Sequence, residues 1–94
     1  MDLIDVFLEG TSDNIEYEDE YFKVLKIIKE IPTGSIYYVK RIQLVKWNGK
    51  QTDIPDLDIR TFDKRTKKYK KGITLSINES KELYKALAEY FNSN

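Results

Sequence analysis

The chain has 94 residues and a formal net charge of zero, and it contains neither cysteine nor histidine. This length predicts a single domain, and the missing residue types exclude a disulfide framework, a cysteine–histidine zinc site and acid–base catalysis by histidine. The first residues lack the basic region of a secretory signal, and no apolar run approaches the ~18 residues that would span a membrane. We therefore expect a soluble, cytoplasmic protein.

The neutral total hides a strong asymmetry of charge along the chain. Residues 1–22 hold eight acids and no basic residue, whereas residues 23–75 hold fourteen basic residues and five acids, a local balance of +9. Such asymmetry favours a polyanionic partner for the basic part and a separate role for the acidic end. The alternative is an ordinary soluble domain with an acidic, disordered leader.

We divide the chain into an acidic leader, residues 1–20, and a domain, residues 21–94. The leader begins with the apolar and acidic stretch "LIDVFL", which fits a short helix or an added strand. Its second part, "EGTSDNIEYEDE", is typical of a loop or of disorder. The leader is therefore expected to act as a spacer, to cover the basic face or to recruit another protein.

The first element of the domain, residues 21–31, is ambiguous. Lys23, Lys26 and Lys29 recur every three residues, which fits an amphipathic helix. The β-branched residues between them fit a strand instead. The sequence "PTGS" then predicts a turn, and because a clear strand follows it, we favour a strand and a hairpin.

Residues 36–47 form that next strand, and the alternation of its side chains assigns two faces. Ile42 and Leu44 point to one face, which we interpret as the core. The other face is expected to be exposed, with rings and charges, and it carries Arg41, Gln43, Val45 and Trp47.

The dipeptide Asn48-Gly49 predicts a two-residue hairpin loop with a type I′ turn. Such a loop would place Trp47 directly opposite Lys50 on the same face. A third strand is then expected from about Lys50 to Phe62, with a bulge or an edge at Pro55. A basic loop, residues 61–71, and a short strand, residues 72–75, follow.

The chain ends with a predicted helix from Ser76 to Phe91. Ser76 and Glu79 have the spacing of a capping box. The apolar stripe of this helix is wider than packing against one sheet face requires. The extra width has two explanations: a second packing partner, such as the same helix of another subunit, or alanines that are present only because they favour helices. The stripe comprises Leu83, Tyr84, Leu87, Tyr90 and Phe91, widened by Ala86 and Ala88.

Taken together, the exposed faces interleave flat rings with cations. Single-stranded nucleic acid has the matching properties, because its bases stack on aromatic rings and its phosphates attract Lys and Arg. Each member also has a simpler explanation: a cation–π pair of Trp47 with Lys50, an ion pair of Arg60 with Asp58 or Asp63, or a core position for Phe62. The candidate nucleic-acid-binding residues are Arg41, Gln43, Trp47, Lys50, Arg60, Phe62, Lys64, Lys68, Tyr69, Lys70 and Lys71.

Three motifs in this order, "VKWNGK", "LDIRTF" and "KKGITLS", followed by a terminal helix, resemble the transcriptional positive cofactor four family and are most similar to its short bacterial members. The resemblance covers residues 21–91. It implies an α+β fold, a four-stranded antiparallel curved sheet followed by a C-terminal helix (ββββα), which dimerises through the helices. It also implies a strand over residues 21–31.

The resemblance further implies a nucleoid-associated homodimer that binds single-stranded DNA with little sequence preference, without a cofactor, a metal or enzymatic activity. Position by position, Trp47 matches a family aromatic that precedes the turn and contacts bases, and Lys50 matches the family cation that follows the turn. The sequence departs from the family pattern at two places. One is "QTDIPD", which lengthens the stretch after the turn, and the other is the acidic leader. The matched cations and ring further along are Arg60, Phe62, Lys70 and Lys71.

Other interpretations compete with binding of single-stranded DNA. A single-stranded RNA-binding module would use the same stacking and phosphate contacts. A protein-interaction adaptor would dock acidic partners on the basic face. An enzyme is the least favoured interpretation, because the only imaginable Mg²⁺ cluster, Asp53, Asp56 and Asp58, comes with no nucleophile or base.

Overall fold

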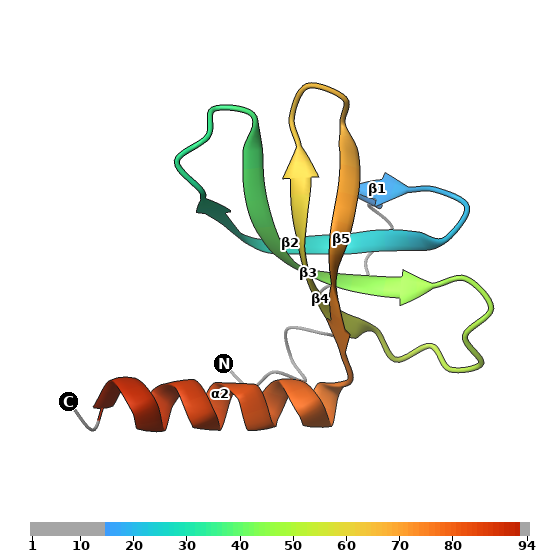
Figure 1. The fold of residues 1–94 in the computed structure, drawn as a ribbon. Helices are drawn as coiled ribbons and strands as arrows, with labels where there is room; N and C mark the ends of the chain where they lie inside the picture. Colours follow the sequence, from blue (N-terminus) through green and yellow to red (C-terminus); the bar gives the residue numbers. More distant parts are fainter. Residues whose placement is uncertain (1–14, 93–94) are drawn as a thin grey trace.

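The computed structural model describes residues 15–92. It has an α+β fold in which one antiparallel sheet of five strands, in the order β1-β2-β3-β4-β5, is followed by a C-terminal helix (Figure 1). The predicted class, the curved antiparallel sheet and the helix are confirmed, but the sheet has five strands where four were predicted. The elements are β1 (Tyr17–Glu18), β2 (Phe22–Pro32), β3 (Tyr38–Trp47), β4 (Asp56–Asp63), β5 (Lys68–Leu75) and α2 (Ile77–Asn92).

The additional strand, β1, lies in the segment predicted to be a leader. Tyr17 pairs with Val24 of β2, and Glu18 pairs with Lys23. The turn between β1 and β2 is held by Asp19, whose Oδ1 accepts hydrogen bonds from the N–H groups of Tyr21 at 2.7 Å and Phe22 at 3.0 Å. This end of the leader is therefore part of the sheet and not a loose loop; the stretch predicted as a helix or strand, residues 3–8, lies outside the described residues.

Strand β2 confirms the strand interpretation and explains its three-residue repeat. Lys23, Lys26 and Lys29 pair with Lys46, Leu44 and Ile42, which are successive residues of one face of β3. Two register shifts, one between residues 24 and 26 and one between residues 27 and 29, each insert one extra residue into β2. Because each bulge lengthens the repeat from two residues to three, all three lysines stay on the same side of the sheet.

The connection from β3 to β4 differs from the predicted hairpin. A turn is present at Asn48-Gly49, but only Gly49 has a positive φ, 85°, so the turn is not type I′. Strand β4 begins at Asp56 and not at Lys50, which leaves a connection spanning residues 48–55. Lys50 therefore does not face Trp47; its Nζ lies 2.7 Å from Oδ1 of Asp56.

The basic run is more ordered than predicted. Strand β4 continues to Asp63, a turn occupies residues 64–67, and β5 begins at Lys68, four residues earlier than the predicted strand. Lys67 sits in the left-handed region with a φ of 60°. A register shift between Arg60 and Phe62 marks a bulge in β5, where Lys70 and Lys71 lie opposite the single residue Thr61 of β4. Most of the predicted loop is thus a hairpin.

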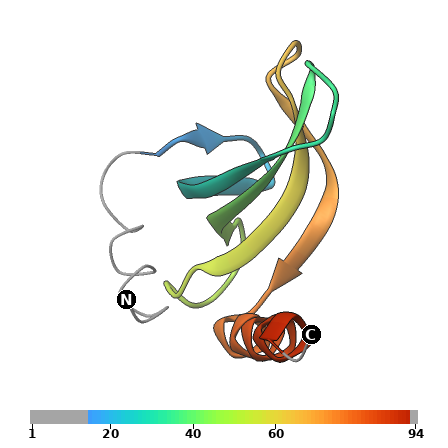
Figure 2. The same ribbon diagram turned by 90° about the vertical axis from the view of Figure 1, so that its left-hand side faces the viewer.

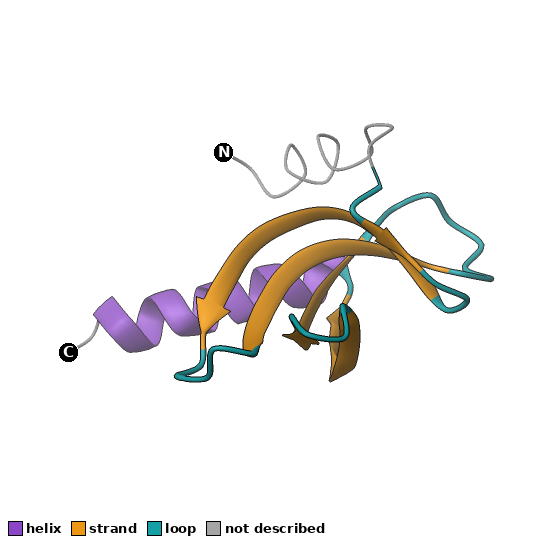
Figure 3. Cartoon of the chain, turned by 90° about the horizontal axis from the view of Figure 1, so that it is seen from above, coloured by secondary structure: helices purple, strands orange, loops and turns teal. Residues whose placement is uncertain are grey.

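The sheet is strongly curled (Figures 2 and 3). The ring of Tyr17 on β1 meets the ring of Tyr69 on β5 with centroids 4.8 Å apart. We call the side enclosed by this curl the concave face; there Phe22, Val24 and Val45 are buried together. The opposite side, the outer face, holds a second apolar cluster around Leu44, Leu57, Ile42, Leu75 and Ile77.

Helix α2 begins with the predicted capping box. The N–H of Ser76 donates to Oε1 of Glu79 at 2.8 Å, and the N–H of Glu79 donates to Oγ of Ser76 at 3.2 Å. The helix follows β5 and extends away from the sheet (Figure 1). Most of the predicted apolar stripe is exposed: Tyr84 to 74%, Tyr90 to 64% and Phe91 to 68%. Within residues 15–92, no helix is long and apolar enough to cross a membrane.

Candidate nucleic-acid interface

A buried carboxylate organises the concave face. Asp58 on β4 is fully buried, and its two oxygens accept hydrogen bonds from three other side chains. Arg60 donates from Nε and Nη2 at 2.7 and 2.9 Å, and Gln43 donates from Nε2 at 3.0 Å. Thr74 on β5 donates its hydroxyl at 2.9 Å. One charge thus joins β3, β4 and β5, and Arg60 neutralises it.

The network continues along the concave face through Tyr69. Its hydroxyl donates to Oε1 of Gln43 at 2.9 Å and accepts from Nη1 of Arg41 at 2.8 Å. Nε of Arg41 in turn donates to Glu30 of β2 at 2.7 Å. Among the described residues, every buried side-chain nitrogen or oxygen has a hydrogen-bond partner. The polar groups of this face therefore satisfy one another.

The expectation that this face is exposed is wrong for several of its members. Gln43 and Val45 are fully buried, and Phe62 is 6% exposed. The guanidinium of Arg41 covers the ring of Phe62, 3.7 Å from its centroid. The simpler explanations given for Phe62 and Arg60, a core ring and an ion pair with Asp58, are confirmed. The reason is the curl, which turns the face inward.

Trp47 is half-buried at the margin of this face. Its ring lies against Phe22 with centroids 5.0 Å apart, and its Nε1 donates to Oγ1 of Thr74 at 3.2 Å. Arg60 lies over the same two rings, 5.2 Å from Phe22 and 5.4 Å from Trp47. Arg60 and Trp47 therefore do share a surface, as predicted, but that surface is already packed.

An open depression of about 340 Å³ remains at the mouth of the curl. Its rings come from both edges of the sheet, with Tyr17 on β1 and Tyr69 on β5, and from the strands and turn between them, with Tyr21, Phe22 and Trp47. Arg60 and Lys68 supply positive charge to the lining, and Asp19 and Glu20 supply negative charge. This balance of charge makes the depression a poor site for a polyanion.

The electrostatics of the depression follow from burial and from short hydrogen bonds. Burial, together with the hydrogen bond to Asp19, raises the pKa of Tyr17 to about 12. Burial also raises the pKa of Tyr69. For Asp19, burial acts to raise the pKa, but hydrogen bonds from the N–H groups of Phe22 and Tyr21 outweigh it and lower the pKa. Both tyrosines thus stay neutral and Asp19 stays charged near neutral pH.

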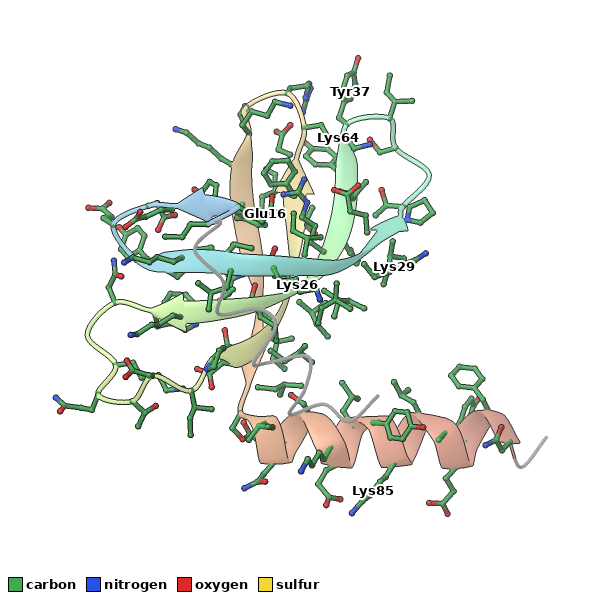
Figure 4. The ribbon with its side chains drawn as sticks, turned by 180° about the vertical axis from the view of Figure 1, so that it is seen from behind. Glu16, Lys26, Lys29, Tyr37, Lys64 and Lys85 are labelled. Carbon is green, nitrogen blue, oxygen red and sulfur yellow. The ribbon has the colours of Figure 1, made fainter. Side chains whose placement is uncertain are left out.

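A different surface gathers exposed cations and rings at the end of the sheet where two hairpins meet (Figure 4). The N–H of Lys64 donates to the carbonyl of Tyr37 at 2.8 Å, and Nη2 of Arg65 donates to the hydroxyl of Tyr38 at 2.7 Å. These bonds fasten the β4–β5 turn to the segment that leads into β3. We call this surface the cationic tip; it consists of Tyr37, Tyr38, Lys64, Arg65, Lys67, Lys68 and Lys70.

Cation–ring contacts arrange the tip. The guanidinium of Arg65 lies 4.2 Å from the ring centre of Tyr37 and 5.3 Å from that of Tyr38. Nζ of Lys70 lies 5.3 Å from the ring centre of Tyr38. Tyr37 is 42% exposed. Residues 64–71 hold six basic side chains and no acid.

The predicted site residues therefore divide into three groups. Arg41, Gln43, Trp47, Arg60, Phe62 and Tyr69 form the packed concave face, Lys64, Lys68 and Lys70 belong to the tip, and Lys71 is exposed beside it. Lys50 stands apart in its ion pair with Asp56.

Sequence reasoning missed the tip residues Tyr37, Tyr38, Arg65 and Lys67. The two neighbouring tyrosines that follow the turn sequence "PTGS" after one intervening residue, Ile36, are the feature of the sequence that could have indicated the rings.

Within the part of the chain that the structure describes, no group of three or more His, Cys, Asp or Glu side chains is placed to hold a metal ion. No protein-family model matches the chain, and no curated protein matches it either. The resemblance to the positive cofactor four family rests on the three sequence motifs.

Proposed function

We propose that the protein binds single-stranded DNA without sequence preference, through the cationic tip, as a homodimer that supports transcription, replication or repair. The observation that carries this proposal is the packing of Arg65 between the exposed ring of Tyr37 and the hydroxyl of Tyr38, within residues 64–71, which hold six cations and no acid. Asp63 lies directly before this run and pairs with Arg65 at 3.4 Å. The resemblance to a single-stranded DNA-binding family supports the choice of DNA.

The chemistry of the tip fits this ligand. An exposed tyrosine ring can stack on a base of any identity, which contributes about 1–3 kcal/mol per base. Lysines around the ring attract phosphates and release their counterions. Because Arg65 already lies over Tyr37 and Tyr38, the rings and the positive charge are held together before the ligand arrives.

The tip is a better contact surface for nucleic acid than the concave face. On the concave face, Arg60 and Gln43 are engaged with Asp58, and Phe62 is covered by Arg41. Binding phosphates or bases there would require breaking buried hydrogen bonds, each of which costs about 1–3 kcal/mol when a partner is left unsatisfied. We assign these residues the role of fixing the curl that brings the hairpin ends together.

The homodimer is supported by the helix. The stripe formed by Tyr84, Leu87, Tyr90 and Phe91 is exposed, and the strands against which α2 packs are β4 and β5. A contiguous exposed apolar surface of this kind is typical of a protein–protein interface. A second copy of α2 fits it, because two identical stripes related by a two-fold axis are self-complementary.

Fluorescence anisotropy with a labelled oligo-dT of ~20 nucleotides tests the proposal. If about four to six phosphates are neutralised, the logarithm of the binding constant falls with the logarithm of the salt concentration at a slope of about −3 to −4. Competition with a matched RNA oligonucleotide separates DNA from RNA preference. Absence of binding at low salt would refute the proposal.

Two tyrosine variants locate the contact. Tyr37→Ala is expected to weaken binding by about 1–3 kcal/mol if the ring stacks on a base. Tyr21→Ala is the matched control, because Tyr21 is also exposed, at 62%, but lines the depression instead of the tip. Loss of affinity in the control and not in Tyr37→Ala would place the contact on the concave face.

A further inference from the structure

The bulge of β5 gathers cations and hydroxyl groups on the outer face, beside the cationic tip. We infer that this group is a phosphate-binding site centred on the hydroxyl of Thr61. We call it the Thr61 site; it consists of Tyr38, Lys40, Thr61, Lys70 and Lys71. The inference adds a ligand site on a second face of the sheet, and it rests on the proposed function only for one source of the phosphate, a nucleic-acid strand.

Three neighbouring strands bring these residues together. Lys40 of β3 pairs with Thr61 of β4, and Lys70 and Lys71 of β5 lie opposite Thr61 on its other side. Neighbouring strands are about 4.8 Å apart, so the backbones that carry the lysines are about 10 Å apart with Thr61 between them. Flexible lysine side chains from both sides can therefore reach one anion above the Thr61 hydroxyl.

The bulge is what places two lysines of β5 on this face. Tyr69 and Gly72 both pair with concave-face residues of β4. The two residues between them share the outer face, because the bulge adds one residue to the usual alternation. In a regular strand, the side chains of Lys70 and Lys71 would point to opposite faces. The bulge thus gives Thr61 a second ammonium group on the side of β5.

A depression on the outer face coincides with the site. It is open, has a volume of about 430 Å³ and, within the described part of the chain, has no acid in its lining. The depression at the mouth of the curl differs, because two acids balance its two cations. The lining on the outer face consists of Thr33, Tyr38, Lys40, Thr61 and Lys70.

The hydrogen-bond donors of the site are available to a ligand. The hydroxyl of Thr61 makes no hydrogen bond to another residue of the described part of the chain. The hydroxyl of Tyr38 accepts from Nη2 of Arg65 at 2.7 Å, which leaves its own hydrogen to donate. Lys40 and Lys70 are exposed, and Nζ of Lys70 is held 5.3 Å from the ring centre of Tyr38.

The nearby acids are engaged elsewhere. Asp63 follows Thr61 by two residues and occupies the same face of β4, but it is 5% exposed and accepts from the N–H of Arg65 at 2.9 Å and from its Nε at 3.4 Å. Glu30 of β2 is bound to Arg41 on the concave face. Among residues 15–92, no carboxylate forms an ion pair with any of the three lysines of the site.

The donor set fits phosphate better than carboxylate. Its hydroxyl and ammonium donors come from three strands and surround one point, and a terminal phosphate offers three acceptor oxygens where a carboxylate offers two. Tyr38 and Lys70 also belong to the cationic tip. A strand bound at the tip can therefore place a neighbouring phosphate in the Thr61 site. An internal phosphodiester, a terminal phosphate and a free phosphate ion share this chemistry.

Titration with inorganic phosphate, followed in ¹H–¹⁵N correlation spectra at constant ionic strength, tests the site itself. The amide signals of Thr61 and Lys70 are expected to shift and saturate. Thr61→Val is expected to weaken this binding about tenfold, because it removes one hydrogen bond to a charged group, and valine is at least as favourable in a strand. Thr52→Val is the matched control, in the exposed connection before β4, and is expected to leave the titration unchanged.

Fluorescence anisotropy with a 20-nucleotide oligo-dT tests the strand as the source of the phosphate. Lys40→Gln is expected to bind about fivefold more weakly at 0.1 M salt and to reduce the salt slope by about 0.7, as the loss of one phosphate contact predicts. Lys85→Gln removes an equal charge from the exposed face of α2 and is expected to bind as the unmodified protein does. Oligonucleotides with and without a 5′-phosphate separate a terminal phosphate from an internal one.

The two measurements distinguish failure of the site from failure of the proposed function. If the unmodified protein does not bind the oligonucleotide but binds phosphate in a Thr61-dependent way, the proposed function fails and the site is one for free phosphate. If Lys40→Gln and Thr61→Val weaken oligonucleotide binding without a response to free phosphate, the site holds a phosphate of the strand. Oligonucleotide binding that both variants leave unchanged, together with no phosphate titration or one that Thr61→Val does not alter, overturns the inference alone.

Discussion

Arg60 forms a two-point ion pair with Asp58, two residues before it on β4, with Nε to Oδ2 at 2.7 Å and Nη2 to Oδ1 at 2.9 Å. The side chain of Asp58 is fully buried, and that of Arg60 is 11% exposed. Nη1 of Arg60 reaches further, to the carbonyl of Lys70 at 3.3 Å. The side chains of Asp58 and Arg60 therefore link β4 to β5 on the concave face.

Asp58→Asn is expected to destabilise the fold by about 3–5 kcal/mol, because it leaves the guanidinium of Arg60 nearly buried without a counter-charge. Urea unfolding followed by far-UV circular dichroism measures the free energy of unfolding. Asp53→Asn is the matched control: its ion pair with Lys46 is exposed, so a change within about 1 kcal/mol is expected. Equal stability of the two variants would mean that the Asp58 network is dispensable.

The sequence predicted the elements well and the exposure of one face poorly. Alternation correctly placed Arg41, Gln43 and Trp47 on one side of β3. It could not show that this side is concave, because the curl brings together residues far apart in the sequence, such as Tyr17 and Tyr69, which are 52 positions apart and lie on opposite edges of the sheet. A face with polar residues was therefore interpreted as solvated, although its polar groups pair with one another.

The candidate site was predictable only in part for a similar reason. The cations of residues 64–71 are visible in the sequence, but their neighbours Tyr37 and Tyr38 come from another hairpin, and long-range bonds from Lys64 to Tyr37 and from Arg65 to Tyr38 bring the two together. The three-residue repeat of lysines in β2 is also visible in the sequence, yet this repeat fits a helix as well as a strand with two bulges. Long-range pairing decides between these, and local sequence does not encode it.

Gly72→Ala is expected to destabilise the protein by about 1–3 kcal/mol through overpacking. Gly72 pairs with Arg60, and a Cβ added there would overlap the Cβ of Arg60 and the carbonyl oxygen of Ile59. Thermal unfolding measures the effect. Gln51→Ala, in the exposed connection before β4, serves as the control and is expected to change stability by less than about 0.5 kcal/mol. A wild-type melting temperature for Gly72→Ala would mean that β5 can shift away from β4 without cost.

Stability is expected to fall between pH 10 and pH 12. Burial raises the pKa of Tyr17 to about 12, above the ordinary value of about 10, and it also raises the pKa of Tyr69. Because the folded state holds these protons more tightly than the unfolded state, the stabilisation is fully present below pH 10 and is lost as the pH rises through the folded-state values.

Urea unfolding at a series of pH values measures this loss, with Tyr17→Phe as the control because it removes the hydrogen bond to Asp19 and the titrating proton together. The variant is expected to be less stable near neutral pH and to lose less stability between pH 10 and pH 12. Parallel curves for the two proteins would show that Tyr17 ionises as it does in the unfolded chain. Tyrosinate absorbance gives an independent titration.

Leu87→Asp is expected to convert a homodimer into a folded monomer. Leu87 lies in the middle of the exposed stripe of α2 and is 47% exposed in the single chain. A charge at the centre of a helix–helix contact would be buried without a partner, which is strongly unfavourable, whereas the isolated chain loses little because the position is open to water. Light scattering after size-exclusion chromatography should give one chain of 11.1 kDa for the variant and twice that mass for the unmodified protein.

Lys85→Glu is the matched control for the dimer, because Lys85 also lies on α2 but points away from the stripe (Figure 4) and pairs only weakly with Glu82, at 3.4 Å. It is expected to keep the dimer mass. Unchanged circular dichroism for Leu87→Asp would show that the helix survives, as it should, since its capping box at Ser76 and Glu79 is untouched. A single-chain mass for the unmodified protein would instead leave the stripe of α2 without a second copy and refute the homodimer.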